Sequence, residues 1–193
     1  MHDLSLMTIG RRIRHRRQQL KKTLDEVARA AGLSCGLISK IENFRTVPSL
    51  PVLARISAAL DTDMADFVAG VTARTTANAY TVIRRDERVP MEREEAKGFQ
   101  YEAIFSKETA ACFWQSVVLT LQPGAQRPAA TTDGDEFLLV LSGSAILRLG
   151  TEVVTLAEGD AIFFDGRIPH TSQPSGTAPA VLFVAYFLEP ANH

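Results

Sequence analysis

The spacing of apolar residues changes along this chain. Over the first third they recur every three to four positions, which predicts amphipathic helices. Beyond that they fall in short runs separated by Pro, Gly and Asp, which predicts strands. The helical spacing is clearest in residues 23–43, where it predicts two short helices joined by a turn. The apolar positions there are Leu24, Val27, Ala28 and Ala31, followed by Leu37, Ile38 and Ile41.

Local signals define the ends of these two helices. Thr23 precedes Glu26 by three positions, which predicts a capping box at the first helix. Gly32 follows the last apolar residue of that helix, where the chain needs a positive φ. Ser34 is placed to cap the second helix.

The second helix has a polar face made of short side chains. Cys35, Ser39 and Asn43 share that face, with Gly36 and Lys40 beside them. A helix that reads base edges in the major groove of DNA needs such a face. An ordinary helical hairpin in a core has the same spacing, so the pattern alone leaves both interpretations open.

Further helices flank this pair. A first helix has Ile9, Ile13 and Leu20 as its apolar stripe among many Arg and Lys residues, Pro48-Ser49 begins a fourth helix, and a short fifth lies around residues 64–68. The segment 9–68 resembles the Xre/Cro/C1 family of helix-turn-helix repressor domains. The matching stretches are RRIRHRRQQLKKTLDEVARAAGLS, LISKIEN and PSLPVLARISAAL. The resemblance implies a five-helix domain that binds double-stranded DNA as a homodimer on a pseudo-palindromic operator.

The resemblance also implies roles for single residues. Positions 35, 36, 39 and 40 are where the family reads bases, and the amide end of the helix that starts at residue 24 is where it holds a phosphate. The expected DNA-binding residues are Thr23, Leu24, Ser34, Cys35, Gly36, Ser39, Lys40, Asn43 and Arg45. Arg17 and Glu42 match an internal ion pair. Because Cys35 and Gly36 donate poorly, Lys40 and Ser39 are expected to make most direct base contacts.

Charge divides along the same boundary. Residues 1–70 contain 11 Lys+Arg and 7 Asp+Glu, a balance of +4, whereas residues 71–193 contain 10 and 15, a balance of −5; together these give the net charge of −1. A basic part suited to DNA is therefore joined to an acidic part that is not.

Targeting signals are not evident. No apolar run approaches the ~18 residues of a transmembrane helix, and the N-terminal residues do not resemble a signal peptide. Cys35 and Cys112 lie in different halves of the chain, which is typical of reduced thiols. We therefore expect a cytoplasmic protein with no membrane segment.

The β part begins after a change in composition. Residues 70–79, GVTARTTANA, are small, polar and without periodicity, and predict a linker between a domain at 1–69 and a domain at 80–193. Short β runs follow at 80–84, 100–105, 112–121, 136–141, 145–149, 153–156, 161–164 and 181–188. Many short strands with regular turns predict a sandwich or barrel. The predicted fold class is α + β in two domains, a helical bundle followed by an all-β barrel.

Two motifs in the β part resemble those of the cupin family. The first is PGAQRPAATTDGDEFLLVLSGSAIL, with Gly124, Glu136 and Gly143 in place. The second is LAEGDAIFFDGRIPHTSQ, with Gly159, Asp160 and His170 in place. The resemblance covers roughly residues 99–188 and implies a double-stranded β-helix barrel with a central pocket. It therefore implies a C-terminal cupin sensor attached to the DNA-binding domain.

The chain departs from metal-binding cupins, which hold an ion with two His and one Glu from the first motif and one His from the second. The two first-motif His positions are Ala130 and Thr132 here, so only Glu136 and His170 remain as ligands. We expect no tightly bound metal and no cofactor. The usual proline of the second motif is replaced by Asp165, which leaves the loop shape open.

A small-molecule effector is the expected ligand of the barrel. Glu136 and His170 are expected to pair and to hold a polar ligand. The residues expected to line the same pocket are Thr132, Gln115 and Trp114, and the sequence leaves open which face of the strand at 112–121 points inward. The alternative is that Glu136 and His170 satisfy each other in a structural pair with no ligand.

Two functions remain open. The first is a transcription regulator whose cupin domain senses the effector, with the homodimer held partly through the barrels and half-sites about 34–36 Å apart. The second is an enzyme, because iron-dependent epoxidases of phosphonate antibiotic synthesis also join such domains. They need two His and one carboxylate, and the matching positions here are Thr132, Glu136 and His170. We therefore expect a regulator and not an enzyme.

Overall fold

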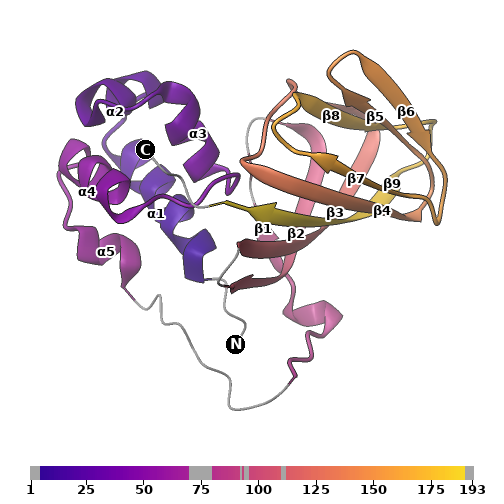
Figure 1. The fold of residues 1–193 in the computed structure, drawn as a ribbon, viewed down its shortest axis with the longest axis horizontal. Coiled ribbons are helices and arrows are strands. Elements are labelled where there is room, and N and C mark those ends of the chain that lie inside the picture. Colours follow the sequence, from indigo (N-terminus) through magenta and orange to yellow (C-terminus); the bar gives the residue numbers. More distant parts are fainter. Residues whose placement is uncertain (1–4, 70–79, 92, 94–95, 110–111, 190–193) are drawn as a thin grey trace. The chain divides into compact units, whose positions relative to one another are not determined.

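The computed structural model describes residues 5–69, 80–91, 93, 96–109 and 112–189. Helices come first and strands follow (Figure 1), which confirms the predicted α + β class. The chain divides into two compact units, Met1–Ala79 with Glu189–His193, and Tyr80–Leu188. The predicted linker at 70–79 lies outside the described residues.

The described part of the first unit contains five helices. They are α1 (Ser5–Gln19), α2 (Leu24–Ala31), α3 (Cys35–Glu42), α4 (Leu50–Ala59) and α5 (Met64–Val68). The predicted helix ends around α2 and α3 are confirmed: Thr23 and Glu26 form a capping box, and Gly32 has φ +61°. Ser34 Oγ accepts a hydrogen bond from the Leu37 N–H at the start of α3. The apolar faces of all five helices meet in one core, whose most deeply buried members include Ile13, Val27, Ile38, Ile56 and Leu60.

A glycine allows α1 to approach α3 closely. A Cβ on Gly10 would overlap the carbonyl oxygen of Ile41 and lie 2.9 Å from a ring carbon of Phe44. Phe44 follows α3 with φ +59°, so the chain reverses there and brings its ring back against α1. Position 10 therefore has no space for any side chain.

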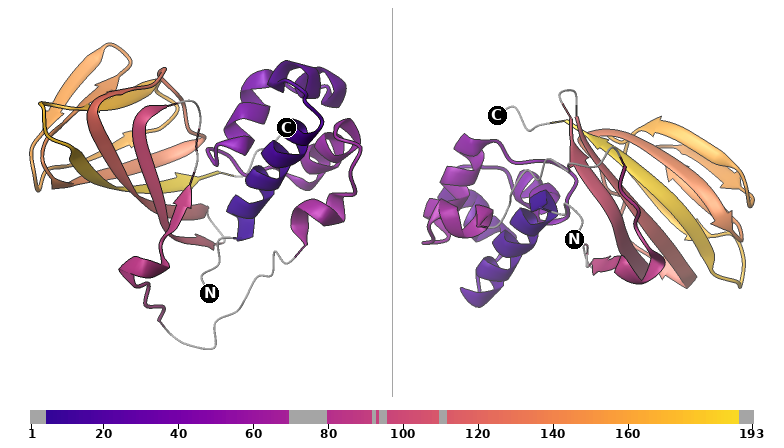
Figure 2. Two further views of the ribbon diagram at one scale, coloured as in Figure 1. Left: turned by 180° about the vertical axis from the view of Figure 1, so that it is seen from behind. Right: turned by 90° about the horizontal axis from the view of Figure 1, so that it is seen from below.

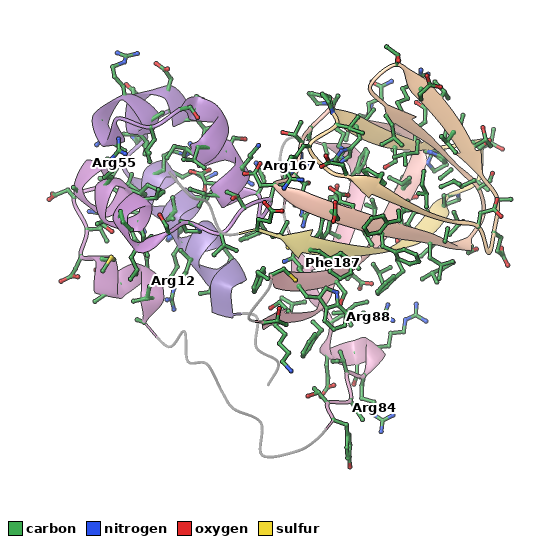
Figure 3. All side chains as sticks on the ribbon, viewed as in Figure 1. Arg12, Arg55, Arg84, Arg88, Arg167 and Phe187 are labelled. Atoms are coloured by element: carbon green, nitrogen blue, oxygen red, sulfur yellow. The ribbon has the colours of Figure 1, made fainter. Side chains whose placement is uncertain are left out.

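Cationic side chains of the first unit bind the carbonyl ends of its helices. A positive charge is stabilised there by the helix dipole and by the unpaired carbonyl groups. The donors and their acceptors are Arg12 Nη1 to Phe67 O (3.0 Å), Arg16 Nε to Leu60 O (3.2 Å), Lys22 Nζ to Ala59 O (2.8 Å) and Arg55 Nε to Ala31 O (2.8 Å). Figure 3 labels two of them, Arg12 from α1 and Arg55 from α4. Much of the basic charge in this unit therefore stabilises the fold.

The second unit is built from two antiparallel sheets. Its described strands are β1 (Val89–Met91), β2 (Lys97–Glu108), β3 (Phe113–Gln126), β4 (Gly134–Ser142), β5 (Ala145–Leu149), β6 (Glu152–Leu156), β7 (Ala161–Asp165), β8 (His170–Pro174) and β9 (Ala180–Leu188). One sheet has the order β1-β2-β3-β9-β4-β7 and the other has the order β6-β5-β8. The two sheets face each other, as the views from behind and from below in Figure 2 show.

The strand prediction needs three corrections. The short strand β1 was not predicted, because its three residues, VPM, contain a proline and show no alternation. The run 80–84 is not a strand, and the chain there leads into a short 3-10 helix, η1 (Arg85–Glu87). The Glu87 carboxylate accepts a hydrogen bond from the Arg84 N–H at the start of this turn. Tyr80 and Val82 are exposed, so the apolar residues of this run do not pack into a core. Strand β8 was missed because its sequence, HTSQP, is polar and ends in proline.

None of the helices in the described residues combines the length and the apolar character needed to cross a membrane.

We predict that Gly10→Ala destabilises the first unit and that Gly36→Ala does not. The Gly10 methyl group would clash with backbone at Ile41, and overpacking of this kind costs about 1–3 kcal/mol. A Cβ at Gly36 would lie 4.0 Å from Ser34 Oγ, and replacing a helical glycine by alanine stabilises the helix by about 0.5–1 kcal/mol. Urea unfolding followed by circular dichroism at 222 nm measures both. Equal midpoints for Gly10→Ala and the wild type would contradict the close approach.

Candidate functional site

The polar face of α3 is presented to solvent. Ser34, Cys35 and Gly36 are exposed, whereas Ser39 and Lys40 are half-buried one turn later. The opposite face is buried through Ile38 and Ile41. At the start of α2, Thr23 is exposed and Leu24 is half-buried. The structure therefore brings seven of the nine predicted DNA-binding residues to accessible or partly accessible positions on α2 and α3.

A buried ion pair fixes α3 against α1. Arg17 Nε donates to Glu42 Oε1 and Arg17 Nη2 donates to Glu42 Oε2, both at 2.7 Å. Glu42 is 3% exposed, and the hydrogen bond that Arg17 donates to its carboxylate raises the pKa of Arg17 above its usual value. Arg17 Nη1 also donates to the Lys22 carbonyl oxygen at 3.0 Å. The predicted internal pair is confirmed, and it sets the orientation of the helix that carries the polar face.

Two predicted DNA-binding residues are not accessible in this structure. Asn43 is buried, and its Nδ2 donates to the Ser39 carbonyl oxygen at 2.9 Å, so its amide completes the end of α3. Arg45 is 4% exposed, because the reversal at Phe44 turns the chain back until the Arg45 N–H donates to the Lys40 carbonyl oxygen at 2.8 Å. The prediction that both side chains face DNA is therefore not supported by this structure.

Five strands of the larger sheet align their inward-facing residues in one row. Gln115 on β3 pairs with Tyr186 on β9, and Tyr186 pairs with Glu136 on β4. Ser106 on β2 and Phe164 on β7 extend the row at either end. Because paired residues of an antiparallel sheet point to the same side, these buried side chains all face the barrel interior. Two of the predicted ligand residues, Gln115 and Glu136, therefore lie on one row.

Strand alternation removes Trp114 from this row. Trp114 precedes Gln115 on β3, so its side chain points to the opposite face of the sheet. It packs there against Phe105, with ring centroids 5.7 Å apart. The prediction that Trp114 lines the pocket is wrong, because successive residues of a strand cannot face the same side.

Glu136 and His170 form the predicted pair inside the barrel. His170 Nε2 lies 3.2 Å from Glu136 Oε1, and both residues are almost fully buried. His170 Nδ1 lies 2.8 Å from the Ile168 carbonyl oxygen, which can only accept, so Nδ1 carries a proton. The other ring nitrogen, Nε2, therefore faces the Glu136 carboxylate. A bare Nε2 and a carboxylate oxygen are both acceptors and would repel at this distance, so a further proton lies on one of these two groups. The contact is an ion pair without hydrogen-bond alignment, so Glu136 Oε1 retains an acceptor position.

The surroundings of Glu136 favour its charged form. Burial raises the pKa of this carboxyl, but His170, Thr132 and Arg93 outweigh burial and hold the pKa below its usual value. Thr132 is 1% exposed, and its hydroxyl has no aligned hydrogen-bond partner. Gly166 lies against the same carboxylate, since a Cβ there would be 3.3 Å from Glu136 Cγ.

Sequence reasoning missed Arg93, which the structure places beside the row. Its Nη1 donates to the Tyr186 hydroxyl at 2.8 Å and its Nη2 donates to Gln115 Oε1 at 2.9 Å. The guanidinium also lies over the rings of Tyr101 and Tyr186, 5.0 and 4.4 Å from their centroids. Arg93 precedes β2 and lies outside both cupin motifs, so no periodicity or motif spacing indicated it.

The donor set of the barrel does not fit a metal ion. The first-motif position 130 is an alanine whose backbone pairs with His170, and position 132 is a threonine. Within the described parts of the chain, no three His, Cys, Asp or Glu side chains are grouped as a metal site requires. One imidazole and one carboxylate, already paired with each other, are too few ligands for tight binding.

The loop before β8 has its own local structure. Asp165 Oδ1 accepts hydrogen bonds from the backbone N–H and from Nη1 of Arg167, both at 3.0 Å. The backbone hydrogen bond from Arg167 lowers the pKa of Asp165. This side-chain turn takes the place of the usual proline and leads the chain to His170.

Two family models match this chain. Residues 8–68 match the helix-turn-helix domain, and residues 117–186 match the cupin domain. No curated protein matches the chain.

Solved structures with the same two-part architecture cover nearly the whole chain. A "HTH_3 family Transcriptional Regulator" from Vibrio cholerae is 18% identical, covers 98% of this chain and 99% of its own, and has a TM-score of 0.50. Hydroxypropylphosphonic acid epoxidase from S. wedmorenis is 21% identical, covers 95% of this chain and 98% of its own, and has a TM-score of 0.51. At these identities the likeness establishes the fold alone.

We predict that Glu136→Gln flattens the acid dependence of stability in the second unit. Because folding lowers the pKa of Glu136, its ionised form contributes stability that is complete above the unfolded pKa near 4.5 and is lost as pH falls through the lowered value. The free energy of unfolding of the variant should therefore fall less steeply with pH in that range.

Trp114 fluorescence reports this transition, since the chain has one tryptophan and it lies on β3. The control is Glu152→Gln, an exposed carboxylate on β6. Identical slopes for the wild type and Glu136→Gln would show that Glu136 does not contribute.

Proposed function

We propose that this chain, a helix-turn-helix domain followed by a cupin domain, is a sequence-specific transcription regulator of the Xre type. The observation that carries this proposal is the α2–α3 pair. Both helices have side-chain caps, and the buried Arg17–Glu42 pair holds α3 so that Cys35 and Gly36 face solvent. A short, unobstructed helix face of this kind suits the major groove.

We assign direct readout mainly to Lys40 and Ser39, and phosphate contact to the start of α2. The exposed residues at the start of α3 are small, so they allow close approach to the bases and provide few donors. DNA shape and the spacing of two half-sites supply the remaining specificity.

The cupin domain is proposed to sense a small-molecule effector. Buried polar side chains converge in its interior from several strands, and some of their atoms lack partners among the described residues. Such an arrangement suits a ligand held by hydrogen bonds and charge. The effector can change the affinity for DNA by no more than the difference between its own affinities for two arrangements of the dimer, one that binds DNA well and one that does not.

A catalytic role is not proposed. The epoxidase likeness is one of fold, and an iron site of the two-His-one-carboxylate type needs a third ligand at position 132, where this chain has a buried threonine. The two free thiols, Cys35 and Cys112, suit a reducing compartment, so we place the protein in the cytoplasm.

Lys40→Ala should weaken binding to the operator by about 1–3 kcal/mol and relax its specificity. The wild type is first used to select DNA from a random pool, and the affinities for selected and scrambled duplexes are then compared at one salt concentration. Lys21→Ala, which removes an exposed cation in the turn after α1, is the matched control. An equal loss on both duplexes would make Lys40 a phosphate contact. Failure of the wild type to enrich any sequence would overturn the regulator proposal.

We propose that the protein is a homodimer held partly through the barrels. One recognition helix reads only a few base pairs, so specificity requires two heads. Phe163 is 62% exposed on the outer face of β7, where it pairs in register with Phe137. An exposed aromatic group beside another apolar residue suits an interface.

Light scattering at micromolar concentration should give the mass of a dimer. Phe163→Glu should shift this mass toward the monomer, whereas Val153→Glu, on an exposed position of β6 in the other sheet, should leave it unchanged. A monomeric wild type would contradict the dimer. A dimer that withstands Phe163→Glu would place the interface elsewhere.

A further inference from the structure

Arg93 is a buried cation whose described hydrogen-bond partners carry no charge. It is 5% exposed, and its hydrogen bonds go to a phenol and to an amide oxygen, which are both neutral. Among the residues that the structure describes, no carboxylate lies within ion-pair distance of it. Charged side chains are almost never fully buried unless they are paired, because an unpaired charge loses its hydration. The two tyrosine rings beside Arg93 offset only part of that loss.

Counting only the described residues, the barrel interior also contains buried polar atoms without an aligned hydrogen-bond partner, and they divide into two sets. Arg93 Nε and Gln115 Nε2 are donors, whereas Glu136 Oε1 is an acceptor and the Thr132 hydroxyl can act as either. Nearly all buried polar groups in proteins are hydrogen-bonded. Glu136 Oε1 already has His170 Nε2 at 3.2 Å, and Thr132 helps to lower the pKa of the same carboxyl. The donors of Arg93 and Gln115 are therefore the part of this set that indicates a ligand.

The two sets lie on either side of Tyr186. Gln115 and Glu136 are its register partners on β3 and β4, so their Cα atoms are two strand spacings, about 10 Å, apart. Both side chains point inward from there. The donors therefore lie at one end of a short interior span and the Glu136 carboxylate lies at the other.

We propose that the barrel binds a small carboxylic acid that carries a hydroxyl or amino group. Its carboxylate is held by Arg93 and Gln115, and its hydroxyl or amino group donates to Glu136. This inference deepens the sensor role proposed above and rests on it. The carboxylate gives Arg93 a charged acceptor beside its neutral described partners, and charge-assisted hydrogen bonds of this kind are the strong ones.

The charges of the site disfavour other ligand classes. A phosphate dianion would place a second negative charge close to Glu136, with one guanidinium to balance it. A neutral alcohol or a simple amine would offer Arg93 no charged acceptor. A carboxylate with a donor group satisfies both ends, and a chain of about three to five carbons fits the two-strand spacing.

The test uses the full-length protein and matched probes. Hydroxy acids and amino acids of three to five carbons, with the donor on the terminal carbon, are titrated by calorimetry. Each probe is paired with its primary amide, which has the same shape without the charge. We expect at least one acid to bind and its amide to bind at least about tenfold more weakly. Comparison of the hydroxyl and amino series identifies the donor group.

Variants locate the carboxylate end. Arg93→Gln should weaken binding of the acid at least about tenfold, and Arg93→Lys should recover part of the loss because it keeps the charge. Arg84→Gln, an exposed arginine beside η1 (Figure 3), should bind as the wild type does. Trp114 fluorescence and circular dichroism establish that each variant is folded. Glu136→Gln should reduce the preference for probes with a donor group.

The inference is overturned if no acid binds, if acids and amides bind equally, or if folded Arg93→Gln binds as the wild type does. DNA selection without any probe is measured separately. Operator binding without acid binding would overturn this inference alone. Acid binding without operator binding would overturn the regulator proposal and leave the ligand site standing.

Discussion

The bidentate contact between Arg17 and Glu42 is the interaction on which the DNA-binding face depends. It joins α1 to the last turn of α3 and buries a carboxylate whose charge is balanced by one guanidinium. Removing one partner of such a pair leaves an uncompensated charge and typically costs about 3–5 kcal/mol. The close approach at Gly10 brings the two helices together, and the ion pair then fixes the orientation of α3. The exposed polar face of α3 is a consequence of both.

The basic charge of the helical unit has a different role from the one its composition indicates. Arg12, Arg16, Lys22 and Arg55 bind backbone carbonyl groups at helix ends, and Arg17 neutralises Glu42. A net charge counted from the sequence does not separate such cations from those that meet phosphate. Because the first residues of α3 are small, proposed DNA binding relies on a few contacts that two symmetric heads present together. The proposed sequence specificity therefore requires the proposed dimer.

The barrel interior changes character along its length. On β3, β4 and β9 the inward positions beyond the polar row are apolar, with Val117, Leu138 and Val184 in the next row, whereas the row itself carries Gln115, Glu136 and Tyr186. The apolar rows hold the two sheets together by burial. The polar row adds little to that packing and concentrates charge among buried side chains. A bound partner would change the electrostatic energy of the ionisable groups buried there, which are Arg93, Glu136 and His170.

Local chemistry determined much of this protein from sequence alone. The capping box at Thr23, the left-handed Gly32, the cap at Ser34 and the Arg17–Glu42 pair were predicted correctly, because each depends on residues a fixed number of positions apart or on a motif with one known geometry. The cupin motifs likewise predicted that Glu136 and His170 meet. The polar strand β8 was missed and the run 80–84 was mistaken for a strand, because apolar periodicity does not report which segments have a core to face.

Only the tertiary structure decided which side chains share the barrel interior. Strand register placed Gln115 on the inward row and turned Trp114 away, although the two are adjacent in sequence. The reversal at Phe44 and the helix-end role of Asn43 removed two predicted DNA contacts from the surface. Arg93 joined the interior from a segment without motif or period, since its neighbours there come from β2, β3 and β9. Contacts between residues distant in sequence depend on register and chain reversal, and those are set by the packing of the whole domain.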